Sequence, residues 1–190
     1  AAWLRDRGMG EGETFAIVMQ NHPEFVDLMV ASSILGTVFV PIDPRTRGDK
    51  LRYMLNFAEC RGAVAPGYAV SEVEAVWSGE SDRWIATLCG KHGAHPGLRE
   101  VLAGPRPDPE LAVASTDPDA PMQLLYTSGT TGDPKAIMST HSRYGVSATL
   151  PAVLGLGAED RLYTGLSLTH ANAQVVTLGM ALHVGIPCVI

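Results

Sequence analysis

The sequence predicts an α/β fold, a parallel-rich sheet with helices on both faces. Short apolar runs alternate along the chain with segments of helical periodicity, which is typical of β-α-β units. The apolar runs show no polar alternation, as expected of strands that are buried on both faces. The chain has 190 residues, 46% of them apolar and 18% charged, which suits one globular domain.

The first half of the chain carries this β-α-β rhythm. A strand over residues 14–19 precedes Asn21 and Glu24, whose spacing predicts a capping box with Asn21 at the N-cap. Gly36 is expected to end that helix. The next expected strand covers 37–41, and a third covers 62–65.

A second helix is expected between the second and third strands. Thr46 and Asp49 are candidate caps for it. Its apolar spacing predicts an inward face, which would consist of Leu51, Met54, Leu55 and Ala58.

The remaining elements are predicted from weaker patterns until residue 122. A connector over 105–121 is rich in Pro and Asp. The apolar runs and helical spacing then predict further strands and helices. The strands are 84–88, 122–126, 136–139, 161–166 and 186–190, and the helices are 1–7, 71–77, 96–102, 141–154 and 172–184.

Charge and cysteine usage exclude several classes of protein. There are 14 Lys and Arg residues against 20 Asp and Glu, a net charge of −6, and the basic residues are scattered. This pattern argues against general nucleic-acid binding but leaves room for one local phosphate site. Three widely spaced cysteines predict no disulfide framework and no zinc site, and they fit a reducing, cytoplasmic location.

The uncharged run 162–190 is interrupted by polar residues, glycines and Pro187, so no transmembrane segment is expected. The chain begins at Ala1 inside an expected helix and stops inside an expected strand. We interpret both ends as truncated.

One segment carries chemistry. Four of the nine residues from Thr127 to Lys135 bear hydroxyl groups and two are glycines. Such a loop after a buried strand can turn its N–H groups inward to form an anion nest, with Lys135 supplying a positive charge. The expected ligand is a polyphosphate. The segment lacks the Gly-Lys-Ser/Thr of a Walker A loop, and the alternative is an ordinary polar hairpin.

Residues Tyr126–Lys135 resemble the signature phosphate loop Y-T-S-G-T-T-G-x-P-K of the adenylate-forming superfamily. That superfamily contains acyl-CoA and aryl-CoA synthetases, peptide-synthetase adenylation domains and firefly luciferase. Residues 12–21 with 23–25, residues 36–45 and residues 161–190 resemble other segments of its large N-terminal domain, most closely that of acyl-CoA synthetases. The resemblance implies that 1–190 is a partial AMP-binding domain, with a β-α-β segment (1–104), the connector (105–121) and a phosphate-loop segment (122–190).

The resemblance implies a two-step reaction. A carboxylic acid and ATP, with Mg²⁺, give an acyl-adenylate and pyrophosphate, and the thiol of coenzyme A then takes the acyl group, as in fatty acid metabolism. Lys135, Thr130 and Thr131 would be catalytic, and Thr130 or Thr131 would approach the metal. The implied phosphate contacts are Thr127, Ser128, Gly129, Thr130, Thr131, Gly132 and Lys135.

A second motif of the family often reads P-L-F-H. Here Ser167-Leu168-Thr169-His170 matches it, with the proline and the aromatic residue replaced. The resemblance places His170 in the substrate pocket, near the reacting carboxylate. The lost aromatic residue leaves the type of acid open.

The other candidate residues have simpler interpretations. His141 is expected to serve in packing or capping, and Asp43 in a turn. His92 and His95 have the spacing of metal ligands, but they flank Gly93 and Pro96 in an expected solvated turn.

Four functions remain open from the sequence. The first is an acid–thiol ligase of which the 190 residues alone are expected to be inactive, because the family's later motifs are absent. The second, within the same family, is a peptide-synthetase adenylation domain. The third is a non-catalytic nucleotide-binding module. The fourth is a plain α/β interaction domain, which would require that the loop have no role in nucleotide binding.

Overall fold

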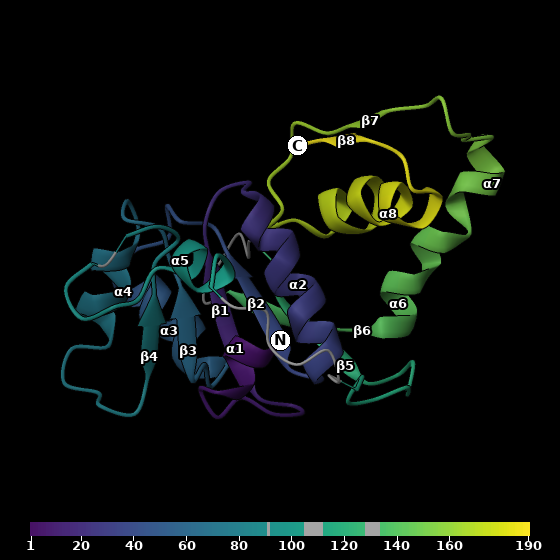
Figure 1. Ribbon diagram of the computed structural model, residues 1–190. Coiled ribbons are helices and arrows are strands. Elements are labelled where there is room, and N and C mark those ends of the chain that lie inside the picture. The colour runs from purple at the N-terminus through teal and green to yellow at the C-terminus, as the bar shows by residue number, and fades with distance from the viewer. Residues whose placement is uncertain (91, 105–111, 128–133) are drawn as a thin grey trace.

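The computed structural model describes residues 1–90, 92–104, 112–127 and 134–190 (Figure 1). Its centre is a six-stranded sheet in the order β4-β3-β1-β2-β5-β6, with five parallel strands and one antiparallel edge strand, β6. The strands are β1 (Thr14–Val18), β2 (Val38–Ile42), β3 (Gly62–Val64), β4 (Trp84–Ala86), β5 (Pro121–Thr127) and β6 (Lys135–Thr140).

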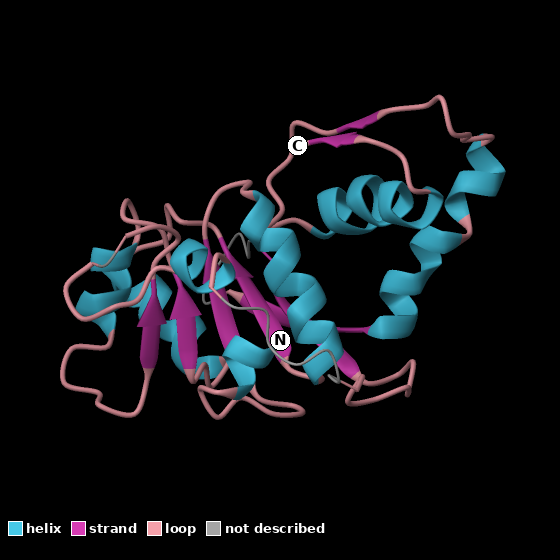
Figure 2. Ribbon diagram, viewed as in Figure 1, coloured by secondary structure: helices cyan, strands magenta, loops and turns pink. Residues whose placement is uncertain are grey.

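Helices cover both faces of this sheet, which confirms the predicted fold class (Figure 2). Neighbouring strand residues point to opposite faces, so Phe15 and Ile17 join one buried cluster while Ala16 and Val18 join the other. Residues of α1 (Ala2–Arg5), α2 (Pro23–Leu35) and α5 (Leu98–Leu102) contribute to the first cluster, and residues of α3 (Gly48–Phe57) and α4 (Val70–Val76) contribute to the second.

The predicted capping box of α2 is wrong. The N-cap is His22, Pro23 occupies the first turn, and no side chain caps the helix. The pre-set φ of proline suits the start of a helix, and this leaves Asn21 free to bond elsewhere. Glu24 contacts Arg99 of α5 instead of the helix start. Gly36 does end α2, with a left-handed φ of 71°.

The predicted caps of α3 are also wrong, whereas its inward face is confirmed. The N-cap is Arg47, and neither Thr46 nor Asp49 makes a capping hydrogen bond. Leu51, Met54, Leu55 and Ala58 are all buried, as the apolar spacing predicted.

The last third of the chain departs furthest from the expectations. The expected helix 141–154 is divided into α6 (His141–Gly145), a 3-10 turn η1 (Val146–Ala148) and α7 (Leu150–Leu154). Pro151 lies in the first turn of α7, and proline does not sit in a continuous helix interior. The expected helix 172–184 consists of a π-helix, η2 (Asn172–Gly179), followed by α8 (Met180–Val184).

The last two strands of the chain are shorter than predicted. They are β7 (Leu162–Tyr163) and β8 (Cys188–Val189), which pair in parallel with each other as a separate two-stranded sheet (Figure 1). None of the helices in the described ranges is long and apolar enough to cross a membrane.

Candidate functional site

A cavity lies where β2 and β5 end. It has a volume of about 660 Å³. Parallel strands present their carboxyl ends at the same edge of a sheet, and ligands of open α/β sheets gather there. Asp43 follows β2, and Thr127 ends β5, so the cavity opens at this edge.

The cavity reaches both ends of the predicted phosphate loop. Thr127 and Pro134 line it, and Lys135 is the exposed residue that begins β6 directly after Pro134. Thr127 and Lys135 are paired across β5 and β6, and the Thr127 hydroxyl donates to the Lys135 carbonyl over 3.3 Å. The remaining predicted loop residues, Ser128, Gly129, Thr130, Thr131 and Gly132, lie outside the described residues.

His170 lines the same cavity. It is separated from Thr127 by 43 residues in the chain, so the fold brings the two family-like motifs to one site. Thr169 and Ala171 line the cavity beside it, and Val175 of η2 and Tyr144 of α6 extend the wall.

Basic side chains are concentrated around this cavity although the chain is acidic overall. Arg45, Arg47 and Lys50 come from the turn after β2 and the start of α3, and Arg143 comes from α6. Arg47 pairs with Glu72 and Arg45 with Asp43. This local excess of positive charge suits a polyanionic ligand.

Among the described residues that line the cavity, Asp43 is the acidic one. Its Oδ1 atom accepts from the Arg45 backbone N–H over 2.9 Å, so it is the turn residue that the sequence predicted. The side-chain hydrogen bond from Arg45 holds the pKa of Asp43 below its usual value, and the nearby His170 contributes in the same direction. Asp43 is therefore charged at neutral pH and keeps Arg45 at the cavity.

Several residues of the site were not singled out by the sequence analysis. The basic group Arg45, Arg47 and Lys50 could have been found as a short basic run in an acidic chain. Gln123 of β5 and Ser139 of β6 had no such signal, because only their cross-strand pairing puts both in the cavity wall.

The other histidines lie away from this site. His141 begins α6, whose N-cap is Thr140, and burial lowers the pKa of His141. His92 and His95 form a tight turn, and His95 Nε2 lies 2.9 Å from the Glu74 carboxylate. Within the described ranges, no group of three or more His, Cys, Asp or Glu residues is arranged to hold a metal ion.

The comparison with family models identifies the family. The model described as AMP-binding enzyme matches residues 1–190, which is the whole chain. The chain therefore belongs to the AMP-binding, adenylate-forming enzyme family, as the phosphate-loop and His170 motifs predicted.

The chain is similar to curated CoA ligases and to a fatty acid transport protein. The chain is 28% identical to a medium/long-chain-fatty-acid–CoA ligase, FadD17, of Mycobacterium marinum, with 87% of the chain and 30% of the relative covered. It is 30% identical to a sulfoacetate–CoA ligase of Cupriavidus necator (90% and 33% covered) and to long-chain fatty acid transport protein 1 of Bos taurus (98% and 30%). The chain spans about a third of the length of these relatives.

Solved structures share the fold. An anthranilate CoA ligase, AuaEII, solved with anthranoyl-AMP, superimposes with a TM-score of 0.89 at 24% identity, covering 98% of this chain and 36% of that one. ATP-bound MatB from Rhodopseudomonas palustris superimposes with a TM-score of 0.84 at 23% identity, covering 100% and 37%. The described sheet and its helices are thus the fold of adenylate-forming enzymes.

Proposed function

We propose that this chain supplies the phosphate loop and part of the acid pocket of an ATP-dependent acid–CoA ligase. The observation that carries the proposal is the cavity that brings His170 to the strand ends flanking the loop. The fatty acid and sulfoacetate ligases among the relatives support coenzyme A as the acceptor. Their substrates differ, so the names do not fix which acid is used.

The first step would be attack of a carboxylate oxygen on the α-phosphorus of ATP. The bond from the α-phosphorus to the bridging oxygen breaks, and pyrophosphate leaves with its negative charge. Preorganised donors and cations at a site are the usual means of stabilising such charge. Thr127, Lys135 and the loop residues between them would contact the β- and γ-phosphates. The basic side chains of the cavity wall would favour binding of the anion, and they are Arg45, Arg47, Lys50 and Arg143.

In the second step, the sulfur of coenzyme A would attack the acyl carbon of the adenylate, and AMP would leave. The family also implies Mg²⁺, which would neutralise phosphate charge when bound. Thr130 and Thr131 would hold it. The described residues near the loop fit a polyphosphate, since Thr127 and the basic side chains face one cavity. His170 would orient the acid at the same cavity.

Acid-dependent ATP–pyrophosphate exchange tests this proposal. The assay uses the full-length protein that contains this sequence, with a panel of short, medium, long and aromatic acids. We expect exchange with one class of acid, and we expect Lys135→Ala to reduce it by about 10²–10³-fold, because one donor to developing charge is lost. Arg5→Ala, which removes a positive charge on α1, is the matched control and should leave exchange unchanged.

The alternatives give different results in the same assay. No exchange with any acid, together with retained nucleotide binding, would favour a non-catalytic module. Exchange that is followed by transfer to a carrier-protein thiol but never to coenzyme A would favour a peptide-synthetase domain. Turnover by the isolated 190 residues would contradict our expectation that they are inactive alone.

A further inference from the structure

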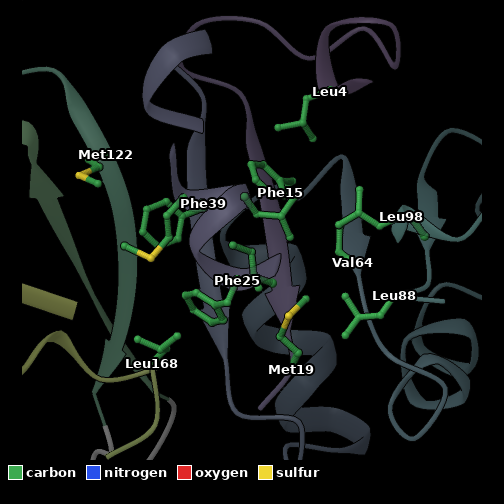
Figure 3. Close-up of a cluster of buried hydrophobic side chains, with 14 of the residues drawn as sticks. Leu4, Phe15, Met19, Phe25, Phe39, Val64, Leu88, Leu98, Met122 and Leu168 are labelled. Atoms are coloured by element: carbon green, nitrogen blue, oxygen red, sulfur yellow. The ribbon is translucent and has the colours of Figure 1, made fainter. Parts of the chain in front are cut away.

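Leu168 lies at the centre of the segment that carries His170, and its backbone is bonded in an unusual way. Its side chain is fully buried and reaches the cluster that contains Phe25 and Phe39 (Figure 3). Both of its backbone polar groups are paired with side chains. Its N–H donates to Asn21 Oδ1 over 2.7 Å, and its carbonyl accepts from Gln174 Nε2 over 2.6 Å.

Asn21 makes a second bond to the same segment. Its Nδ2 atom donates to the Leu166 carbonyl over 3.0 Å. The carboxamide thus uses its acceptor and its donor on two backbone groups of one segment, as a peptide group of a neighbouring strand does. Asn21 is distant from this segment in the chain, at the carboxyl end of β1.

The segment has few other backbone ties to the large sheet. Residues 164–171 belong to no strand, and β7 and β8 pair with each other. A buried backbone N–H without a partner is costly, and such groups are nearly always paired in folded proteins. The Leu168 backbone therefore depends on Asn21 and Gln174 to stay buried where it is.

Both partners are themselves held in place. The Tyr68 hydroxyl accepts from the Gln20 backbone N–H over 2.9 Å and lies 3.0 Å from His22 Nε2, so both neighbours of Asn21 are tied to the loop after β3. On the other side, Gln174 is fully buried, and its carbonyl accepts from the Tyr144 hydroxyl over 2.7 Å.

We propose that Asn21 is a positioning residue for acid binding, because its side chain fixes residues 166–168 and thereby sets the place of His170 at the cavity. The proposal rests on the proposed function only for its kinetic consequence. Its structural part, the dependence of the segment on Asn21, stands on the hydrogen bonds themselves. A small displacement of a group that orients a substrate is enough to lower a rate markedly.

The test compares Asn21→Ala with Gln20→Ala in the full-length protein. Gln20 is exposed and its bond to Tyr68 comes from the backbone, so Gln20→Ala is the matched control. In ATP–pyrophosphate exchange, we expect Asn21→Ala to lower kcat/KM for the acid by about tenfold to a hundredfold. The KM for ATP should stay within about twofold, since the phosphate loop belongs to β5 and β6.

Hydrogen exchange of the Leu168 amide gives a readout that needs no activity. We expect its protection to fall in Asn21→Ala and to persist in Gln20→Ala. Asn21→Asp keeps the acceptor for the Leu168 N–H but loses the donor to Leu166, so the amide should stay protected while kcat/KM for the acid still falls.

Each outcome decides one of the two proposals. If the wild-type protein shows no ATP–pyrophosphate exchange with any acid, the proposed function fails. Hydrogen exchange of the Leu168 amide then decides by itself whether Asn21 fixes the segment. Unchanged protection in Asn21→Ala would overturn the proposal. Equal losses for the acid and for ATP would also overturn it, because they would indicate a merely structural role.

Discussion

The large sheet and the last 29 residues are held in place by different means. In β1 and β2, every residue except Thr14 is buried, and the ladder of parallel hydrogen bonds is continuous. In residues 162–190, β7 and β8 are two residues each, and Tyr163 is 75% exposed. The first region is stabilised by burial of many apolar side chains. The second adds a smaller apolar contribution, from Leu168, Ala173 and Leu178, and side-chain hydrogen bonds such as those of Asn21 and Gln174.

This difference teaches where the precision of the site comes from. The sheet supplies a rigid edge, at which Asp43 and Thr127 are fixed by the strands that precede them. His170 reaches that edge from residues 164–170, which lie in no helix or strand, so its position is set by particular polar contacts. Regions with few buried contacts open at lower free energy than the core of the same protein.

The largest expected effect on stability comes from shortening one buried side chain in each of the two regions. Phe39→Ala should lower the free energy of unfolding by about 3–5 kcal/mol, and Leu168→Ala by about 2–5 kcal/mol, because each leaves a cavity. Under Leu168→Ala, hydrogen exchange should accelerate in residues 162–190 and remain slow in β1 and β2. Denaturant unfolding and hydrogen exchange measure the two effects.

The control for this comparison is Val189→Ala, since Val189 is 49% exposed in β8. It should change unfolding by less than about 0.5 kcal/mol. Equal acceleration of hydrogen exchange in both regions under Leu168→Ala would show that the large sheet and residues 162–190 unfold as one unit.

An intermediate effect is expected from two matched tyrosines. The Tyr126 hydroxyl donates to the Met54 carbonyl, and the Tyr144 hydroxyl donates to the Gln174 carbonyl, each over 2.7 Å. Tyr126→Phe and Tyr144→Phe should each cost about 0.5–1.5 kcal/mol of stability in thermal or denaturant unfolding. Only Tyr144→Phe should also speed exchange of the Leu168 amide, because Tyr144 bonds to Gln174, which itself bonds to Leu168, whereas Tyr126 bonds to Met54 of α3. The opposite pattern would mean that Gln174 is held without Tyr144.

The smallest expected effect is on stability at acid pH, and it involves the pair of Glu24 in α2 and Arg99 in α5. The hydrogen bond from Arg99 holds the pKa of Glu24 below its ordinary value of 4.5, against the opposing effect of burial. A lowered pKa in the folded state gives stability that is complete above about pH 4.5 and is lost as the pH falls through the folded value. Melting temperatures from pH 7 to pH 3 should therefore fall less steeply for Glu24→Gln than for the wild type. Parallel curves would mean that the Glu24–Arg99 pair contributes nothing to the loss of stability at acid pH.

The sequence predicted the elements that a single local pattern specifies. Continuous apolar runs predicted β1 to β3, and helical spacing predicted the buried face of α3 at Leu51, Met54 and Leu55. The phosphate-loop motif predicted that residues 127–135 join two strands, and β5 and β6 flank this segment. These features could be read in advance because periodicity and turn chemistry act over a few neighbouring residues.

Tertiary structure decided what local patterns leave open. Asn21 has the sequence signature of a helix cap, but its carboxamide bonds to Leu166 and Leu168 across the fold. A capping bond and a bond to a distant backbone group differ little in free energy, so the packing of Leu168 against the core decides between them. The joining of His170 to the basic side chains of the cavity likewise follows from contacts between segments that are distant in the chain, which no single segment of the sequence specifies.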